Sequence, residues 1–163
     1  MPGALLRRAM KKTILLVEDS KVQKLASERI LLRAGHLVLF AEDGEEALRL
    51  ARECVPDLIL LDLLLPGIGG EEVLHELKGD RETQRVPVIV LSQLPPINSD
   101  KLRAAGAASY FEKSRLTGEE GGEEALLATI DGVLRESEAA QAATKKQPQI
   151  HHGQPSRAAG HGK

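Results

Sequence analysis

Five short apolar runs alternate along the chain with segments in which apolar residues return every three or four positions. Each run predicts a buried β-strand, and each periodic segment predicts a helix. The runs lie at residues 13–17, 37–41, 57–62, 87–92 and 108–111. The periodic segments lie at about residues 21–34, 43–54, 70–78 and 99–105, with a last helix that frays beyond Glu138. Five strands that alternate with five helices predict an α/β domain with a parallel sheet and right-handed crossovers.

Helical spacing also predicts which side of each helix faces the sheet. In the first helix, Val22, Leu25, Ala26 and Ile30 share one face, while charged residues take the other. The other long helices carry similar stripes. These are Ala47, Leu48 and Ala51, then Val73, Leu74 and Leu77, and finally Leu126, Ile130, Val133 and Leu134. We expect these side chains to pack against the sheet.

The third run delivers one carboxylate, Asp62, to the end of a continuous apolar strand, just before a Pro/Gly turn. Burying an unpaired carboxylate is costly, so Asp62 lies at a solvated sheet edge, is held by a cation, or both. Ligands of open parallel sheets bind outside the carboxyl ends of the strands. Asp62 is therefore the first candidate for chemistry, and a helix cap or turn former is the alternative.

The ends of the other strands carry further polar side chains. Glu18 and Asp19 follow the first strand, Ser92 ends the fourth, and Lys113 follows the fifth. In a parallel sheet these ends share one edge, so three carboxylates meet there and repel one another unless a hard cation such as Mg²⁺ is bound. One carboxylate can then attack phosphorus, with Lys113 as a fixed positive charge and Ser92 as a hydrogen-bond donor. Taken singly, these residues also read as helix caps, a strand terminator and a surface charge.

Composition and charge favour one domain and exclude several classes of protein. The chain has 163 residues and 42% hydrophobic residues, of which only three are aromatic, so its core is built from small aliphatic side chains. A net charge of −2 gives no case for a nucleic-acid partner. Cys54 is the only cysteine, which excludes an internal disulfide and fits a reducing cytoplasm. No run approaches the roughly 18 apolar residues that insert into a membrane.

The two ends of the chain differ from the middle in composition. We expect residues 1–11 to form a flexible lead-in and residues 12–138 to form the folded domain. Residues 139–163 contain Ile150 as their only large apolar side chain, so they cannot offset the entropy of ordering and are expected to be disordered.

These motifs together resemble the receiver domains of two-component response regulators, of the chemotaxis single-domain type. The matching residues are Leu15 to Ser20, Leu61 to Pro66 with Gly70, Leu91-Ser92, and Gly106-Ala107 with Tyr110 to Lys113. The resemblance covers about residues 12–137 and implies a flavodoxin-like, doubly wound sheet in the order 2-1-3-4-5. It also implies a cytoplasmic protein with Mg²⁺ as its cofactor and a sensor histidine kinase or phosphotransfer protein as its partner.

The resemblance assigns a role to each candidate residue. Asp62 would be the phospho-acceptor, and Glu18, Asp19 and the backbone carbonyl of Leu64 would join it in holding Mg²⁺. Lys113 would contact the phosphoryl group, while Ser92 and Tyr110 would be the switch residues. Two features depart from the family pattern. Ser114 replaces a proline that usually follows the lysine, and Gln93 with the stiff Pro95-Pro96 pair replaces a small residue and a mobile loop.

Three functions are compatible with this pattern. The main hypothesis is a phosphorylated module without an output domain, which signals to an unknown target through a face around Asp100, Lys101, Arg103 and Tyr110. The second is a phosphorylation-independent adaptor on the same fold, suggested by Ser114 and the stiff loop. The third is a phosphatase with an aspartyl nucleophile, although such enzymes carry a second acid where this chain has Leu64.

Overall fold

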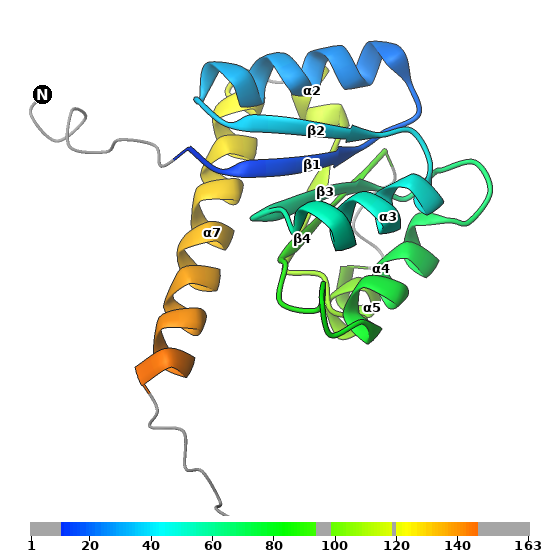
Figure 1. Cartoon of the computed structure of the whole chain (residues 1–163). Helices are drawn as coiled ribbons and strands as arrows, with labels where there is room; N and C mark the ends of the chain where they lie inside the picture. The colour runs from blue at the N-terminus through cyan, green and yellow to red at the C-terminus, as the bar shows by residue number, and fades with distance from the viewer. Residues whose placement is uncertain (1–10, 94–98, 119, 147–163) are drawn as a thin grey trace, which may run out of the picture.

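The computed structural model describes residues 11–93, 99–118 and 120–146, and these contain one five-stranded parallel sheet (Figure 1). The strand order β2-β1-β3-β4-β5 and the parallel pairing confirm the predicted fold. The strands are β1 (Thr13–Val17), β2 (Leu37–Ala41), β3 (Leu58–Asp62), β4 (Val88–Ser92) and β5 (Ser109–Glu112). The expected lead-in, except for residue 11, lies outside the described residues.

Six helices occur among the described residues, where the sequence predicted five. They are α2 (Lys21–Arg33), α3 (Gly44–Cys54), α4 (Gly70–Gly79), α5 (Ser99–Ala104), α6 (Ser114–Gly118) and α7 (Gly122–Lys146). The additional helix is α6, which has five residues and is too short to show a helical period. Helix α7 continues eight residues past the expected fraying point at Glu138, and the tail beyond Lys146 lies outside the described residues.

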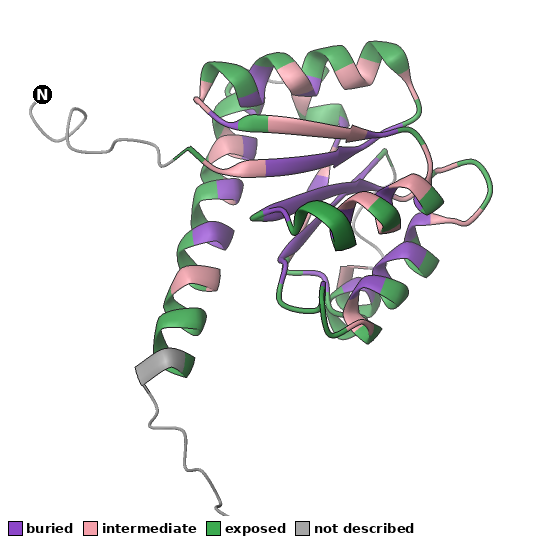
Figure 2. Ribbon diagram, viewed as in Figure 1, coloured by how far each residue is buried: buried purple, intermediate pink, exposed green. Residues whose placement is uncertain are grey.

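The sheet separates two apolar cores, because successive side chains of a strand point to opposite faces. In β1, Leu15 and Val17 pack with α3, α4 and α5, while Ile14 and Leu16 pack with α2 and α7. Residues 58–61 of β3 are fully buried, as predicted for a strand covered on both faces (Figure 2). No described helix combines the length and apolar character that crossing a bilayer requires.

The predicted inner faces of α4 and α7 are confirmed, but the one assigned to α2 is wrong. Val22 and Leu25 are 78% and 63% exposed, and only Ile30 of the expected stripe is buried. The buried residues of α2 are Ser27, Ile30 and Leu31, all in its second half. The residues of α2 before Ser27 are exposed or only partly buried, so their apolar spacing did not indicate burial.

The loop after β3 is held tightly against the start of α4. The Gly70 amide donates a hydrogen bond to the Leu63 carbonyl at 3.1 Å. A Cβ at Gly70 would lie 2.5 Å from the carbonyl oxygen of Asp62 and 2.6 Å from the Cα of Leu63. Only glycine allows this close approach, so the turn that follows Asp62 depends on the absence of a side chain at Gly70.

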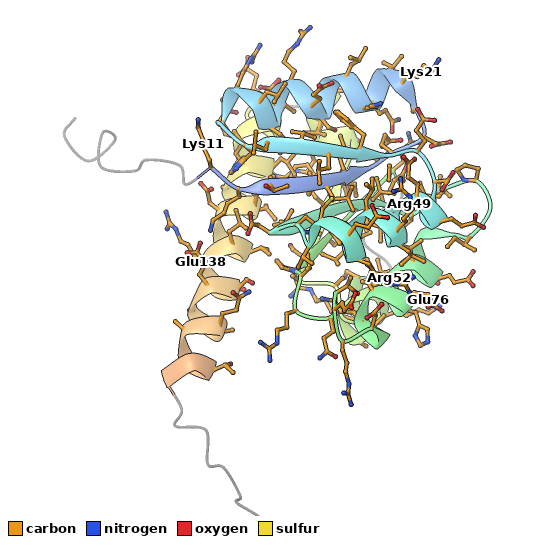
Figure 3. All side chains as sticks on the ribbon, viewed as in Figure 1. Lys11, Lys21, Arg49, Arg52, Glu76 and Glu138 are labelled. Atoms are coloured by element: carbon orange, nitrogen blue, oxygen red, sulfur yellow. The ribbon has the colours of Figure 1, made fainter. Side chains whose placement is uncertain are left out.

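A second group of polar side chains lies at the opposite end of the sheet, where β1 begins. The Lys12 ammonium pairs with Glu138 of α7 at 2.6 Å, and Glu138 is labelled in Figure 3. His36 lies in the turn before β2 and is buried. Its Nδ1 accepts a hydrogen bond from the Lys12 amide at 3.3 Å. Burial lowers the pKa of His36, and this effect outweighs the nearby charges of Asp131 and Asp57.

Candidate functional site

The strand register brings the expected acidic residues together at the carboxyl edge of the sheet. Val17 pairs with Leu61, so the residues that follow them, Glu18 and Asp62, lie side by side. Asp62 in turn pairs with Leu91, which places Ser92 one position beyond it on β4. Parallel strands that start in register also end together, which is why strand ends far apart in the sequence meet here.

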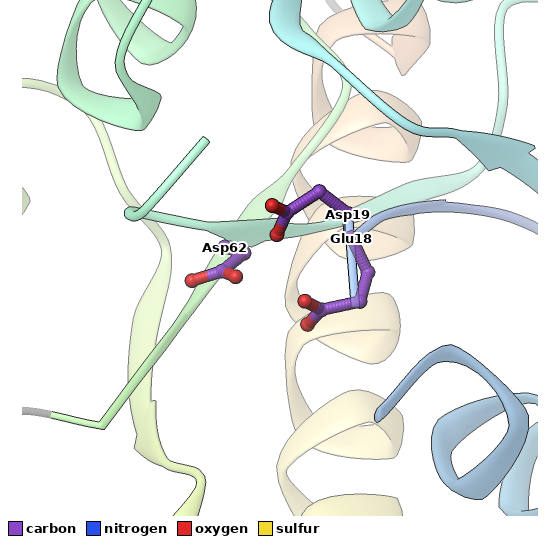
Figure 4. Close-up of side chains that lie close together, drawn as sticks. All are labelled: Glu18, Asp19 and Asp62. Carbon is purple, nitrogen blue, oxygen red and sulfur yellow. The ribbon is translucent and has the colours of Figure 1, made fainter. Parts of the chain in front are cut away.

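Three carboxylates converge at this edge. One oxygen each from Glu18, Asp19 and Asp62 lies within 4.8 Å of the others, and Figure 4 shows the three side chains around a common space. Glu18 and Asp62 are only 2% and 4% exposed, while Asp19 is open to solvent. Oxygen donors with this charge suit a hard divalent cation such as Mg²⁺.

Lys113 points into the same site from the end of β5. Its ammonium lies 2.5 Å from Glu18 Oε2 and 2.9 Å from Asp62 Oδ2, and the residue is buried. The Lys113 amide donates to the Ser92 carbonyl at 2.8 Å, which continues the pairing of β5 with β4. The described residues contain no cis peptide bond, so Lys113 reaches the acids with a trans bond to Ser114.

The charges at this edge do not balance without a further cation. Burial raises the pKa of Glu18, the charge of Asp62 acts in the same direction, and the bond from Lys113 opposes both. One lysine faces three carboxylates, which leaves negative charge in a site that is mostly shielded from water. The residues present therefore fit a divalent cation on chemical grounds.

Backbone amides fix the orientation of two of the carboxylates. Asp62 Oδ1 accepts a hydrogen bond from the Leu64 amide at 3.1 Å, and Glu18 Oε1 accepts one from the Ser20 amide at 3.2 Å. Both bonds come from the residue two positions ahead, in the loop that leaves each strand. The chain thus holds these oxygens in place before any ligand arrives, which lowers the cost of binding one.

The two expected switch residues lie at different depths. Ser92 is 1% exposed at the end of β4, and its carbonyl accepts the hydrogen bond from the Lys113 amide. Tyr110 pairs with Val90 in the sheet and packs partly against the core on the α3 side. The Pro95-Pro96 segment between them lies outside the described residues.

Sequence reasoning missed one residue of this site, Gln23. Its side-chain oxygen accepts a hydrogen bond from the Lys113 ammonium at 2.5 Å. Gln23 lies in the first turn of α2, where its backbone amide donates a hydrogen bond to the hydroxyl of the capping residue Ser20 at 3.4 Å. A polar residue four positions after Asp19 is the only sequence signal, and it is too common to identify a site.

Comparison with known proteins gives a consistent result. The family model of the response regulator receiver domain matches residues 14–118. Protein PilH of Pseudomonas aeruginosa is 36% identical over 123 residues, which span 74% of this chain and 96% of PilH. The polar-differentiation response regulator DivK of Brucella ovis is 34% identical over 105 residues, which span 64% of this chain and 85% of DivK.

A solved structure extends the comparison to three dimensions. The receiver domain of a sensor histidine kinase from Pseudomonas aeruginosa is 28% identical and superposes with a TM-score of 0.66. The match covers 76% of this chain and 98% of that receiver domain. That structure contains a magnesium ion coordinated in its active-site cleft.

Proposed function

Because this chain belongs to the response regulator receiver domain family of two-component signalling, we propose that Asp62 accepts a phosphoryl group from a phosphohistidine. The donor is a sensor histidine kinase or a phosphotransfer protein. The observation that carries the proposal is the convergence of three carboxylates and a buried lysine at one edge of the sheet. Like charges this close repel, so the cluster serves chemistry better than it serves stability.

The acidic residues have a second proposed role as metal ligands. Glu18, Asp19 and Asp62 hold Mg²⁺, together with the backbone carbonyl of Leu64, and this assignment is supported by the grouping of carboxylate oxygens. When bound, Mg²⁺ offsets the negative charge of the carboxylates and of the phosphoryl oxygens. The solvent-exposed position of Asp19 leaves a route by which a hydrated ion can enter.

The transfer itself needs few protein groups. An oxygen of Asp62 attacks phosphorus, and the bond from phosphorus to the imidazole nitrogen breaks as the new bond forms, with the electron pair leaving on the nitrogen. Lys113 exchanges one carboxylate contact for a phosphoryl oxygen, and the Ser92 hydroxyl donates a hydrogen bond to another. Tyr110 changes rotamer with Ser92 and so carries the change to the surface.

Binding of a partner is the proposed output, and the name of the relative DivK as a response regulator supports a role in signalling. We propose that the partner contacts the face of α5 and β5, around Asp100, Lys101, Arg103 and Tyr110. Lys101 is exposed there and pairs only loosely with Glu71 at 3.7 Å. We propose that this activity takes place in the cytoplasm, where Mg²⁺ and a phosphohistidine donor would be available.

Phosphoryl-mimic binding provides a direct test. Tyr110 is the only tyrosine and the chain has no tryptophan, so tyrosine fluorescence reports on the neighbourhood of β5 without labelling. We expect Mg²⁺ with beryllofluoride to change this fluorescence, and acetyl phosphate with Mg²⁺ to add the mass of one phosphoryl group. Asp62→Asn should abolish both effects.

Asp57→Asn is the matched control, since Asp57 lies at the other end of the same strand and accepts a hydrogen bond from the Thr13 amide at 2.8 Å. This variant should behave as the wild type does. If wild type and Asp62→Asn are equally unresponsive and Mg²⁺ binds poorly, the chain is a phosphorylation-independent adaptor. Turnover of p-nitrophenyl phosphate would instead indicate a phosphatase.

A further inference from the structure

The contact between Gln23 and Lys113 has no counterpart among the roles assigned above. We propose that Gln23 is a positioning residue, whose side-chain carbonyl holds the Lys113 ammonium beside Asp62 so that it meets the phosphoryl group. This inference rests on the proposed function, because it concerns how the lysine of that site is kept in place.

The Lys113 ammonium has three N–H donors and three close acceptors. They are Glu18 Oε2 at 2.5 Å, Asp62 Oδ2 at 2.9 Å and Gln23 Oε1 at 2.5 Å. The two carboxylates are shared, because they are also proposed metal ligands and Asp62 is the phospho-acceptor. The amide oxygen of Gln23 is neutral and serves the lysine without adding charge to the site. It is therefore the acceptor that remains available when the carboxylates change partners.

Lys113 also has space into which it can move. A cavity of about 330 Å³ lies between α2 and α6, and Gln23, Ser27, Lys113, Leu116 and Thr117 contribute to its lining. The residue after the lysine is Ser114, which is exposed and lacks the ring by which a proline restricts the backbone. A side chain of four methylenes with an open cavity beside it needs an acceptor to hold one rotamer.

Gln23 is well placed for this task because it belongs to a rigid element. It lies in the first turn of α2, which begins at the capping residue Ser20 directly after Glu18 and Asp19. The acids and the glutamine thus come from one continuous segment, while Lys113 comes from the end of β5. The contact closes the site between these two segments.

The proposal predicts a separation between anion binding and metal binding. Gln23→Met keeps the length of the side chain and removes the acceptor. At saturating Mg²⁺, the affinity of Gln23→Met for beryllofluoride should fall roughly tenfold, as expected for a lost hydrogen bond to a charged group. The affinity for Mg²⁺ alone should stay within about twofold of wild type, since no proposed ligand has changed.

Two further variants make the test specific. Thr117→Val removes a hydroxyl from the same cavity without touching the lysine, and it should bind beryllofluoride as the wild type does. Lys113→Met removes the group through which Gln23 acts, so adding Gln23→Met to it should cause no further loss. If Gln23→Met melts early, Gln23→Asn, which is one methylene shorter, should show the same weakening in a folded protein.

The outcomes separate the two proposals. Wild-type affinity in Gln23→Met, or an equal loss from Gln23→Met in the Lys113→Met background, overturns the role of Gln23. Equal losses in Gln23→Met and Thr117→Val also overturn it, because the cavity and not the acceptor would then matter. If the wild type itself binds no beryllofluoride with Mg²⁺, the proposed function fails instead.

Discussion

Replacing Lys113 with methionine tests whether the acidic edge is held together by one cation that a metal can partly replace. The lysine is 8% exposed and pairs with Glu18 at 2.5 Å and with Asp62 at 2.9 Å. Methionine occupies similar volume, so the main effect of the change is electrostatic. Two buried carboxylates then lose their partner, and breaking a buried ion pair in this way costs about 3–5 kcal/mol.

The expected result depends on magnesium. In EDTA, the free energy of unfolding of Lys113→Met should fall by about 3–5 kcal/mol relative to wild type. Saturating Mg²⁺ should then narrow this gap by about 1.4 kcal/mol or more, because the variant offers the same oxygens without a competing cation and should bind the ion at least tenfold more tightly. Urea unfolding followed by far-ultraviolet circular dichroism measures both quantities.

Lys78→Met is the matched control for this experiment. Lys78 is half-buried, and burial lowers its pKa, but its ammonium donates to the backbone carbonyls of Gln84 at 3.1 Å and Val86 at 2.8 Å. The control should lose stability and show the same response to Mg²⁺ as the wild type. An equal narrowing in both variants, or no loss of stability in Lys113→Met, would refute the electrostatic account of the site.

Three other features of the structure make shorter predictions. Because burial lowers the pKa of His36, the unfolded chain takes up the proton first as the pH falls below about 6.5, so stability should decrease there. Urea melts at several pH values should show that the free energy of unfolding falls less with pH in His36→Asn than in the wild type. The control His75→Asn, on the exposed side of α4, should show the same fall as the wild type. Gly70→Ala places a Cβ 2.5 Å from the Asp62 carbonyl oxygen, so urea melts should show that the free energy of unfolding falls by about 1–3 kcal/mol. Calorimetric titration of the same variant should show weaker binding of Mg²⁺. Asp43 caps α3 by accepting a hydrogen bond from the Glu46 backbone amide at 2.8 Å, so Asp43→Ala should lower the free energy of unfolding by about 0.5–2 kcal/mol. Calorimetric titration should show an unchanged affinity for Mg²⁺.

The fold was predictable because each strand corresponds to a short apolar run in the sequence. The residues of β3 are apolar at every position up to Asp62, and this pattern has one explanation, a strand buried on both faces. The stripes of α4 and α7 were predictable for the same reason, since Val73, Leu74, Ile130 and Val133 are all buried as expected. In these elements, the apolar pattern therefore predicted correctly which side chains face the core.

The missed features lie where the pattern and the packing diverge. Helix α6 has only five residues, so no period can appear in it. The Gln23 contact joins residues 90 positions apart in the chain, and nothing local requires it. The Gln23 contact depends on how the end of β5 meets the start of α2, which is a tertiary relation that a single sequence does not encode in its periodicity.

The error in α2 and the omission of Gln23 have one physical origin. Ser20 starts the helix immediately after Glu18 and Asp19, so the first turns of α2 lie beside the site, and the buried residues begin only at Ser27. In the first turn, the side chain of Gln23 reaches across the edge of the sheet to Lys113. The apolar Val22 is therefore exposed although its spacing predicts burial, and the polar Gln23 beside it belongs to no periodic pattern. Because the acids directly precede the helix cap, the first turn of α2 lies beside the site and contributes Gln23 to it.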